Sequence, residues 1–275
     1  GIVTLPGLEQ AIGAPAINRV PREMIIKEVQ AVCEKYHYTE GVEVCISVPN
    51  GAVVAEKTFN QRLGIQGGIS ILGTSGIVEP MSEQALIDTI RTEMKMHLAD
   101  GEQTLLITPG NYGQDFLHET LKIELKRSIK CSNFIGDTID MGCELGAKGM
   151  LFVGHIGKLV KLGAGIMNTH SKMADGRMEI LAACAVRAGA GIETVRNILD
   201  CVTTDAALEL LKNEKILGKT MEQLMLRIDA CLQKRGGDNM QIGAVVFSNE
   251  YGLLGKTEQA DELLLKITAD VSSEK

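Results

Sequence analysis

Residues 149–157 read GMLFVGHIG, and they open a run of glycines, lysines and histidines that continues to Ile180. The four residues from Met150 to Val153 are all apolar, a pattern typical of a strand buried on both faces of a parallel sheet. The glycines and His155 that follow indicate a sharp strand end. A strand buried on both faces needs helices above and below it, so this stretch favours an α/β fold.

The same succession of strand, glycine-containing loop and helix precedes this stretch three times. Strands with their loops are predicted at 68–76, 103–113 and 129–137, and helices at about 82–98, 114–127 and 138–147, the first with Ser82 as its N-cap. Helices dominate from 175 to 235. We therefore predict an α/β fold, with a parallel sheet that carries helices on both faces.

The two ends of the chain show a different pattern. A helix is predicted from about Pro21 to Lys35, and VEVCISVPNGAVVAEKT (42–58) predicts a hairpin that turns at Asn50-Gly51. MQIGAVVFSNEYGLLGKT (240–257) predicts a similar hairpin. We expect the N- and C-terminal hairpins to share a smaller α+β domain, formed by 1–66 with 240–275 returning to it. The α/β domain with its helical C-terminal part would then span 67–239.

Composition limits the function classes. The formal net charge is −7, Trp is absent, and there are four Tyr and five Phe, which argues against a nucleic-acid binder. The seven cysteines show no zinc-type spacing and are expected to be reduced thiols in the cytoplasm, with no metal site. No apolar run is long enough to span a membrane. Homo-oligomerisation stays open.

Ligands of open α/β sheets bind at the carboxyl ends of the strands. Four such ends combine glycine with small polar residues: 73–76, 108–113, 132–137 and 154–158. Glycine after a strand is often only a turn, but four such loops on one edge favour a ligand site. The GTSG sequence at 73–76 is neither a Walker P-loop nor a G-x-G-x-x-G dinucleotide motif.

Several polar residues near these ends have two interpretations. His155 is a proton acceptor or hydrogen-bond donor in a cleft, or a histidine that begins a helix. Asp137 assists a proton shift or only caps a helix. Lys158 and Lys161, three residues apart, face an anion or form a solvated surface. No Ser-His-Asp order or G-x-S-x-G motif is present, so group transfer from an activated cofactor, which depends mostly on positioning, fits the sequence.

Four stretches carry a resemblance to a known family: 15–25 (PAINRVPREMI), 63–82 (LGIQGGISILGTSGIVEPMS), 108–113 (TPGNYG) and 131–183. In these the sequence resembles the CbiD family, the cobalt-precorrin-5B C(1)-methyltransferases of anaerobic cobalamin (vitamin B12) biosynthesis. The resemblance implies methyl transfer from S-adenosyl-L-methionine to ring carbon 1 of a cobalt-bound tetrapyrrole, giving S-adenosylhomocysteine and cobalt-precorrin-6A. Cobalt would belong to the substrate. Family members typically begin with a further segment, and we expect this chain to lack it.

The roles of individual residues are our hypothesis. We expect the methyl donor to be held by Gly73, Thr74, Ser75, Gly76, Pro109, Gly110, Asn111 and Tyr112. We expect the carboxylates of the tetrapyrrole to be bound by Asn133, Lys158, Lys161, Asn168, His170, Lys172 and Arg177. His155 and Asp137 are the candidate catalytic residues. The alternatives are a non-catalytic carrier of corrinoid intermediates and another α/β transferase with a nucleotide-like cofactor.

Overall fold

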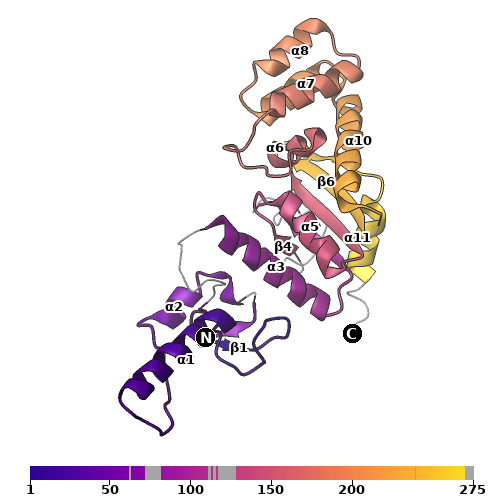
Figure 1. Ribbon diagram of the computed structural model, residues 1–275. Helices are drawn as coiled ribbons and strands as arrows, with labels where there is room; N and C mark the ends of the chain where they lie inside the picture. The colour runs from indigo at the N-terminus through magenta and orange to yellow at the C-terminus, as the bar shows by residue number, and fades with distance from the viewer. Residues whose placement is uncertain are drawn as a thin grey trace. The chain divides into compact units, whose positions relative to one another are not determined.

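The computed structural model describes residues 1–61, 63–71, 82–110, 113, 116, 128–238 and 240–269. The chain divides into two compact units, Gly1–Asp100 and Gly101–Lys275 (Figure 1). The division lies later than the predicted boundary at residue 66, because helix α3 (Glu83–Ala99) belongs to the first unit. None of the helices in these ranges is both long and apolar enough to cross a membrane.

The first unit is built around a small core. Strand β1 (Ile2–Val3) pairs antiparallel with β2 (Ile65–Gln66), and Val3, Leu63 and Met96 are buried together. Its helical elements are α1 (Arg19–Lys35), α2 (Gly51–Ala55), the 3₁₀ turn η1 (Phe59–Gln61) and α3. The predicted N-cap of α3 is confirmed, because the Ser82 hydroxyl accepts the N–H of Ala85 at 3.1 Å.

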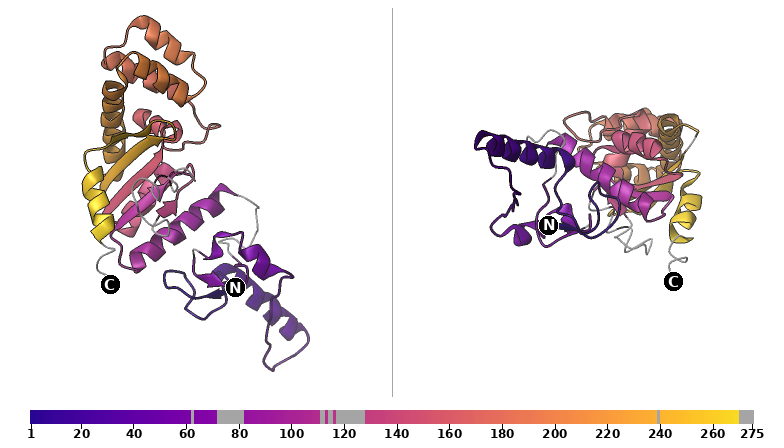
Figure 2. Two further views of the ribbon diagram at one scale, coloured as in Figure 1. Left: turned by 180° about the vertical axis from the view of Figure 1, so that it is seen from behind. Right: turned by 60° about the horizontal axis from the view of Figure 1, so that its bottom comes forward.

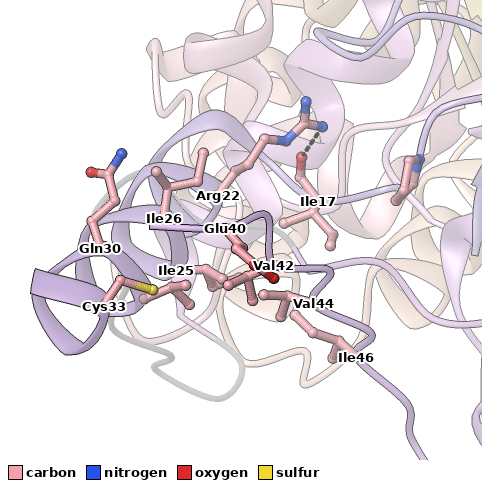
Figure 3. Close-up of a pocket in the computed structure, with 12 residues that line it drawn as sticks. Ile17, Arg22, Ile25, Ile26, Gln30, Cys33, Glu40, Val42, Val44 and Ile46 are labelled. Atoms are coloured by element: carbon pink, nitrogen blue, oxygen red, sulfur yellow. Dashed lines mark hydrogen bonds between the residues drawn. The ribbon is translucent and has the colours of Figure 1, made fainter. Parts of the chain in front are cut away.

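The hairpin predicted at 42–58 is wrong. Asn50-Gly51 begins helix α2 instead of a tight turn, and residues 39–48 form no strand. Val42, Val44 and Ile46 nevertheless lie on one side of the segment and face α1 across an apolar groove of about 600 Å³ (Figure 3). Alternating apolar residues therefore predicted which side chains share a face. They could not supply the neighbouring backbone that a strand requires.

The second unit contains a five-stranded sheet in the order β4-β3-β5-β6-β7. The strands are β3 (Thr104–Thr108), β4 (Ser128–Lys130), β5 (Gly149–His155), β6 (Gln241–Ser248) and β7 (Gly252–Lys256). The first four strands of this order are mutually parallel, and β7 runs antiparallel to β6. Every residue of β5 from Gly149 to Gly154 is buried, as its apolar sequence predicted. The α/β fold is thus confirmed.

Helices cover both faces of this sheet (Figures 1 and 2). On one face lie α5 (Ile135–Leu145) and α10 (Leu217–Gly236), which pack against each other; α10 also packs on β6. On the other face α11 (Ala260–Ala269) buries Leu263 and Ile267 against Leu151, Val153 and Phe247. The remaining helices are α6 (Ile156–Leu159), the 3₁₀ helix η4 (Val160–Ala164), α7 (Arg177–Arg187), α8 (Ile192–Leu199) and α9 (Thr204–Asn213).

The C-terminal hairpin forms, but it lies in the second unit. Strand β6 pairs with β5 along the whole length of β5, from Gly149↔Gln241 to His155↔Phe247. The expectation that 240–275 returns to the N-terminal region was therefore wrong. The cause is visible in β6 itself, whose residues from Ile242 to Ser248 are all buried. Such a strand requires neighbours on both sides and helices on both faces.

Candidate functional site

The order of the strands places a switch point between β3 and β5. These two strands are neighbours, yet β3 connects onward to β4 on one side while β5 connects onward to β6 on the other. Ligands of open α/β sheets bind in the crevice outside the carboxyl ends of two such strands. Here those ends are Thr108–Gly110 and His155–Lys158. We call them the switch-point edge.

Lys158 joins three strand ends at this edge. It lies in α6, directly after β5, and its Nζ donates to the carbonyl oxygen of Pro109 at 2.5 Å and to that of Ser132 at 3.3 Å. Pro109 follows β3, and Ser132 lies in the loop after β4. Burial lowers the pKa of the Lys158 ammonium below its ordinary value. The structure therefore brings together Pro109, Gly110 and Lys158, which were predicted for different ligands.

His155 ends β5 and caps α6. Its Nδ1 accepts the N–H of Gly157 at 3.1 Å, and its ring lies edge-on to Phe247, with 5.7 Å between the ring centroids. Burial lowers the pKa of the imidazole, and the nearby Asp205 carboxylate partly offsets this. A neutral ring that accepts at Nδ1 carries its proton on Nε2. Nε2 is thus the ring nitrogen that can donate a hydrogen bond at neutral pH. The interpretation as a histidine that begins a helix is confirmed, and a role toward a ligand stays a prediction.

Asp137 lies in the first turn of α5, and its charge acts on Arg235 of α10. The neighbouring Gly136 is pressed against Arg235, whose guanidinium donates to both carboxylate oxygens of Asp140 at 2.9 and 2.6 Å. These bonds, and to a smaller extent the charges of Asp140 and Asp137, raise the pKa of Arg235. None of the contacts given for the described part of the chain joins Asp137 to His155, so the two candidate catalytic residues remain separate alternatives.

Lys161 faces the interior and not a ligand. Its residue surface is 2% exposed, and its Nζ donates to the carbonyl oxygens of Thr169 at 3.1 Å and Ala174 at 2.7 Å. The ammonium therefore holds the loop between η4 and α7. The prediction that Lys161 contacts a substrate carboxylate is therefore corrected, because a buried lysine bonded to two carbonyl groups cannot present its charge at the surface.

The same loop lies against the end of β4. Asn133 accepts from Thr169 twice, at its carbonyl oxygen (3.0 Å) and at its side-chain oxygen (3.3 Å), and Phe134 forms an isolated bridge with Asn168. Asn168 in turn accepts the N–H of His170 at 3.1 Å. The structure thus brings Asn133, Asn168 and His170 together.

The remaining cations of the basic stretch lie nearer the solvent. Lys172 is exposed, and its backbone N–H donates to Nδ1 of His170 at 3.1 Å. Arg177 donates from two guanidinium nitrogens to Asp175, at 2.7 and 3.0 Å. This pairing lowers the pKa of Asp175. The charge of Arg177 is therefore already partly neutralised, whereas no acid is found beside Lys172 in the described residues.

Sequence reasoning missed three polar groups near the strand ends. Ser248 ends β6 and donates to Asp205 in the first turn of α9 at 2.8 Å. Both were missed because β6 had been assigned to another domain. Thr108 ends β3, is fully buried, and its hydroxyl has no hydrogen-bond partner among the described residues. The sequence shows that Thr108 stands at the end of a strand, before Pro109 and Gly110. It does not show that the Thr108 hydroxyl lacks a hydrogen-bond partner among the described residues.

Several predicted site residues lie outside the described part of the chain: Gly73, Thr74, Ser75, Gly76, Asn111 and Tyr112. In the described part, no group of three or more His, Cys, Asp or Glu side chains is placed to hold a metal ion. The seven cysteines are unpaired, and burial raises the pKa of Cys131 to about 12. A tetrapyrrole that carries its own cobalt would not require a protein metal site.

Comparisons with known proteins agree along most of the chain. A sequence model of the CbiD family matches residues 1–80, and a model described as the CbiD C-terminal domain matches 168–258. The cobalt-precorrin-5B C(1)-methyltransferase of Alkaliphilus metalliredigens is 47% identical over 96% of this chain and 69% of its own length. The proteins of that name from Ruminiclostridium cellulolyticum and Clostridioides difficile are 45% and 39% identical over 90% and 96% of the chain.

The chain spans about two thirds of the length of these relatives, namely 69%, 65% and 66%. A crystal structure of a cobalamin biosynthesis protein (cbiD) from Archaeoglobus fulgidus is 27% identical and covers 63% of this chain and 56% of that one, with a TM-score of 0.25.

Proposed function

The chain belongs to the CbiD family, and from that membership we propose that it transfers a methyl group to carbon 1 of cobalt-precorrin-5B in anaerobic cobalamin biosynthesis. The methyl donor would be S-adenosylmethionine, and the products S-adenosylhomocysteine and cobalt-precorrin-6A. The observation that carries this proposal is the 38–47% identity to proteins named for that reaction. The unpaired thiols suit the cytoplasm as its place of action.

The switch-point edge is the proposed site of the methyl donor. Three features there suit a small polar ligand: the buried Thr108 hydroxyl lacks a partner within the part of the chain that the structure describes, Gly110 allows a close backbone approach, and Lys158 has a third N–H beyond its two carbonyl bonds. When bound, the donor supplies an activated methyl group, so the protein contributes mainly positioning. Residues 73–76, Asn111 and Tyr112 stay part of this proposal.

The carboxylates of the tetrapyrrole are proposed to meet the loop that Lys161 holds. Within it His170 and Lys172 are exposed, and Asn168 and Asn133 lie beside them. Arg177 could bind a carboxylate by exchanging its partner Asp175, both of which are partly exposed. Lys161 is no longer included, because its charge is buried. Lys158 moves from the substrate to the donor side of the site.

His155 is proposed to donate a hydrogen bond from Nε2 and not to remove a proton. Its Nδ1 lone pair is already used by Gly157, and its lowered pKa keeps the ring neutral. Asp137 stays the alternative candidate for assisting a proton shift, and its charge acts on Arg235 of α10.

Methyl transfer is tested by incubating the protein with S-adenosylmethionine labelled in its methyl group and with cobalt-precorrin-5B. We expect the label in the ring and one S-adenosylhomocysteine for each methyl group transferred. Binding of the tetrapyrrole without labelled product would favour the non-catalytic carrier. Transfer that proceeds only with another nucleotide-like donor would favour the other transferase.

A further inference from the structure

Lys158 is bonded to backbone groups that are far apart in the sequence. Its ammonium contacts Pro109 after β3 and Ser132 after β4, while its own backbone follows β5. Two of its three N–H groups are used in this way. The side chain thus ties three loops to one point at the carboxyl edge of the sheet.

The surroundings of Lys158 make it unfavourable for its side chain to carry a charge. Lys158 is half-buried, and burial opposes its ionisation. The titratable groups that act on it are the thiol of Cys131, which stays protonated and therefore neutral, and the ammonium of Lys161, which repels it. An apolar side chain would avoid this cost. A half-buried charge at an edge where ligands bind favours a contribution to function.

Lys161 provides an internal comparison. It also donates to two carbonyl oxygens, but both belong to the single loop between η4 and α7. Lys161 therefore orders a loop, whereas Lys158 fixes the distance between strand ends that belong to different parts of the sequence. The two lysines are three residues apart in the sequence, and the different roles that we assign to them follow from the different carbonyl groups that their side chains contact.

We propose that Lys158 is a positioning residue, which sets the spacing of the loops after β3, β4 and β5 so that the methyl donor fits the switch-point edge. The proposal rests on the proposed function for the identity of the ligand. The link that Lys158 makes between the loops, which we call the clamp, rests on its hydrogen bonds to the carbonyl groups of Pro109 and Ser132. The clamp can be tested without a ligand.

The first experiment measures amide hydrogen exchange in the wild-type chain, Lys158→Met and Lys161→Met. The N–H of Cys131 donates to Thr108, and that of Phe134 donates to Cys131, both at 3.0 Å, so they report on the loops that Lys158 joins. We expect faster exchange at these two amides in K158M only. In K161M the faster exchange should fall at Met173 and Ala174, whose N–H groups both donate to the carbonyl of His170. Equal protection of Cys131 in K158M and wild type would overturn the clamp.

The second experiment measures the dissociation constant of S-adenosylhomocysteine by calorimetry. We expect it to rise about tenfold in K158M, because the strand ends that receive the ligand lose the charged hydrogen bonds that hold them together, and to return part of the way to the wild-type value in Lys158→Arg. Unchanged affinity in K158M would overturn the positioning role. If the wild type binds no S-adenosylhomocysteine, the proposed function fails, while hydrogen exchange still decides the clamp. Should K158M not fold, Lys158→Gln serves in both experiments.

Discussion

Single residues show how far spacing alone can predict a role. The sequence places His155 at a strand end, and this holds. It also places Lys158 and Lys161 on one face of a helix, but they lie in two successive elements, α6 and η4. What the side chains bond to depends on Pro109, Ser132, Thr169 and Ala174, which only the folded chain brings near. Long flexible side chains take their partners from the tertiary structure, so an anion-binding role could not be distinguished from a structural one.

His155 yields a prediction at this scale. Replacing it with Asn should retain the cap of α6, since Asn is among the best N-cap residues, whereas Ala should lower the free energy of unfolding by about 1 kcal/mol. Because the folded-state pKa of His155 lies below 6.5, its contribution to stability is complete above about pH 6.5 and is lost as the pH falls. Urea unfolding between pH 5 and 8 measures both effects. A wild-type stability that rises on acidification relative to H155N would contradict this sign.

At the scale of elements, the two predicted hairpins had different outcomes for one reason. Both show alternating or continuous apolar residues followed by a turn signal. Strand β6 pairs with β5 on one side and with β7 on the other, and helices cover both faces of the sheet. Segment 42–48 faces α1 on one side only, and no strand in the described part of the chain pairs with it. The spacing of apolar residues along the sequence predicts which face of a segment is apolar. Whether the segment pairs as a strand depends on the other strands of the sheet.

This contrast can be measured by two truncations to alanine. Phe247 is 1% exposed and is stacked on Phe116 with 4.2 Å between ring centroids. Phe247→Ala should cost about 3–5 kcal/mol of unfolding free energy through the cavity it leaves. Val44 is 49% exposed, so Val44→Ala should change stability by less than about 0.5 kcal/mol. Equal losses in denaturant unfolding would show that segment 42–48 is packed more tightly than this structure has it.

For the whole molecule, the α/β class followed from the sequence because a parallel sheet imposes the same local pattern on each of its strands. The switch point did not follow, since it depends on the spatial order β4-β3-β5-β6. The long-range error, which sent the C-terminal hairpin to the first unit, had the same origin. It also removed Ser248 and Asp205 from the candidate site.

The methyl donor is proposed to bind at the switch-point edge of the second unit, and a crystal structure of the protein with S-adenosylhomocysteine decides this. We expect the ligand outside the carboxyl ends of β3 and β5, within about 4 Å of Gly110 and Lys158. A ligand seated elsewhere, for example in the apolar groove between α1 and residues 40–46, would contradict it.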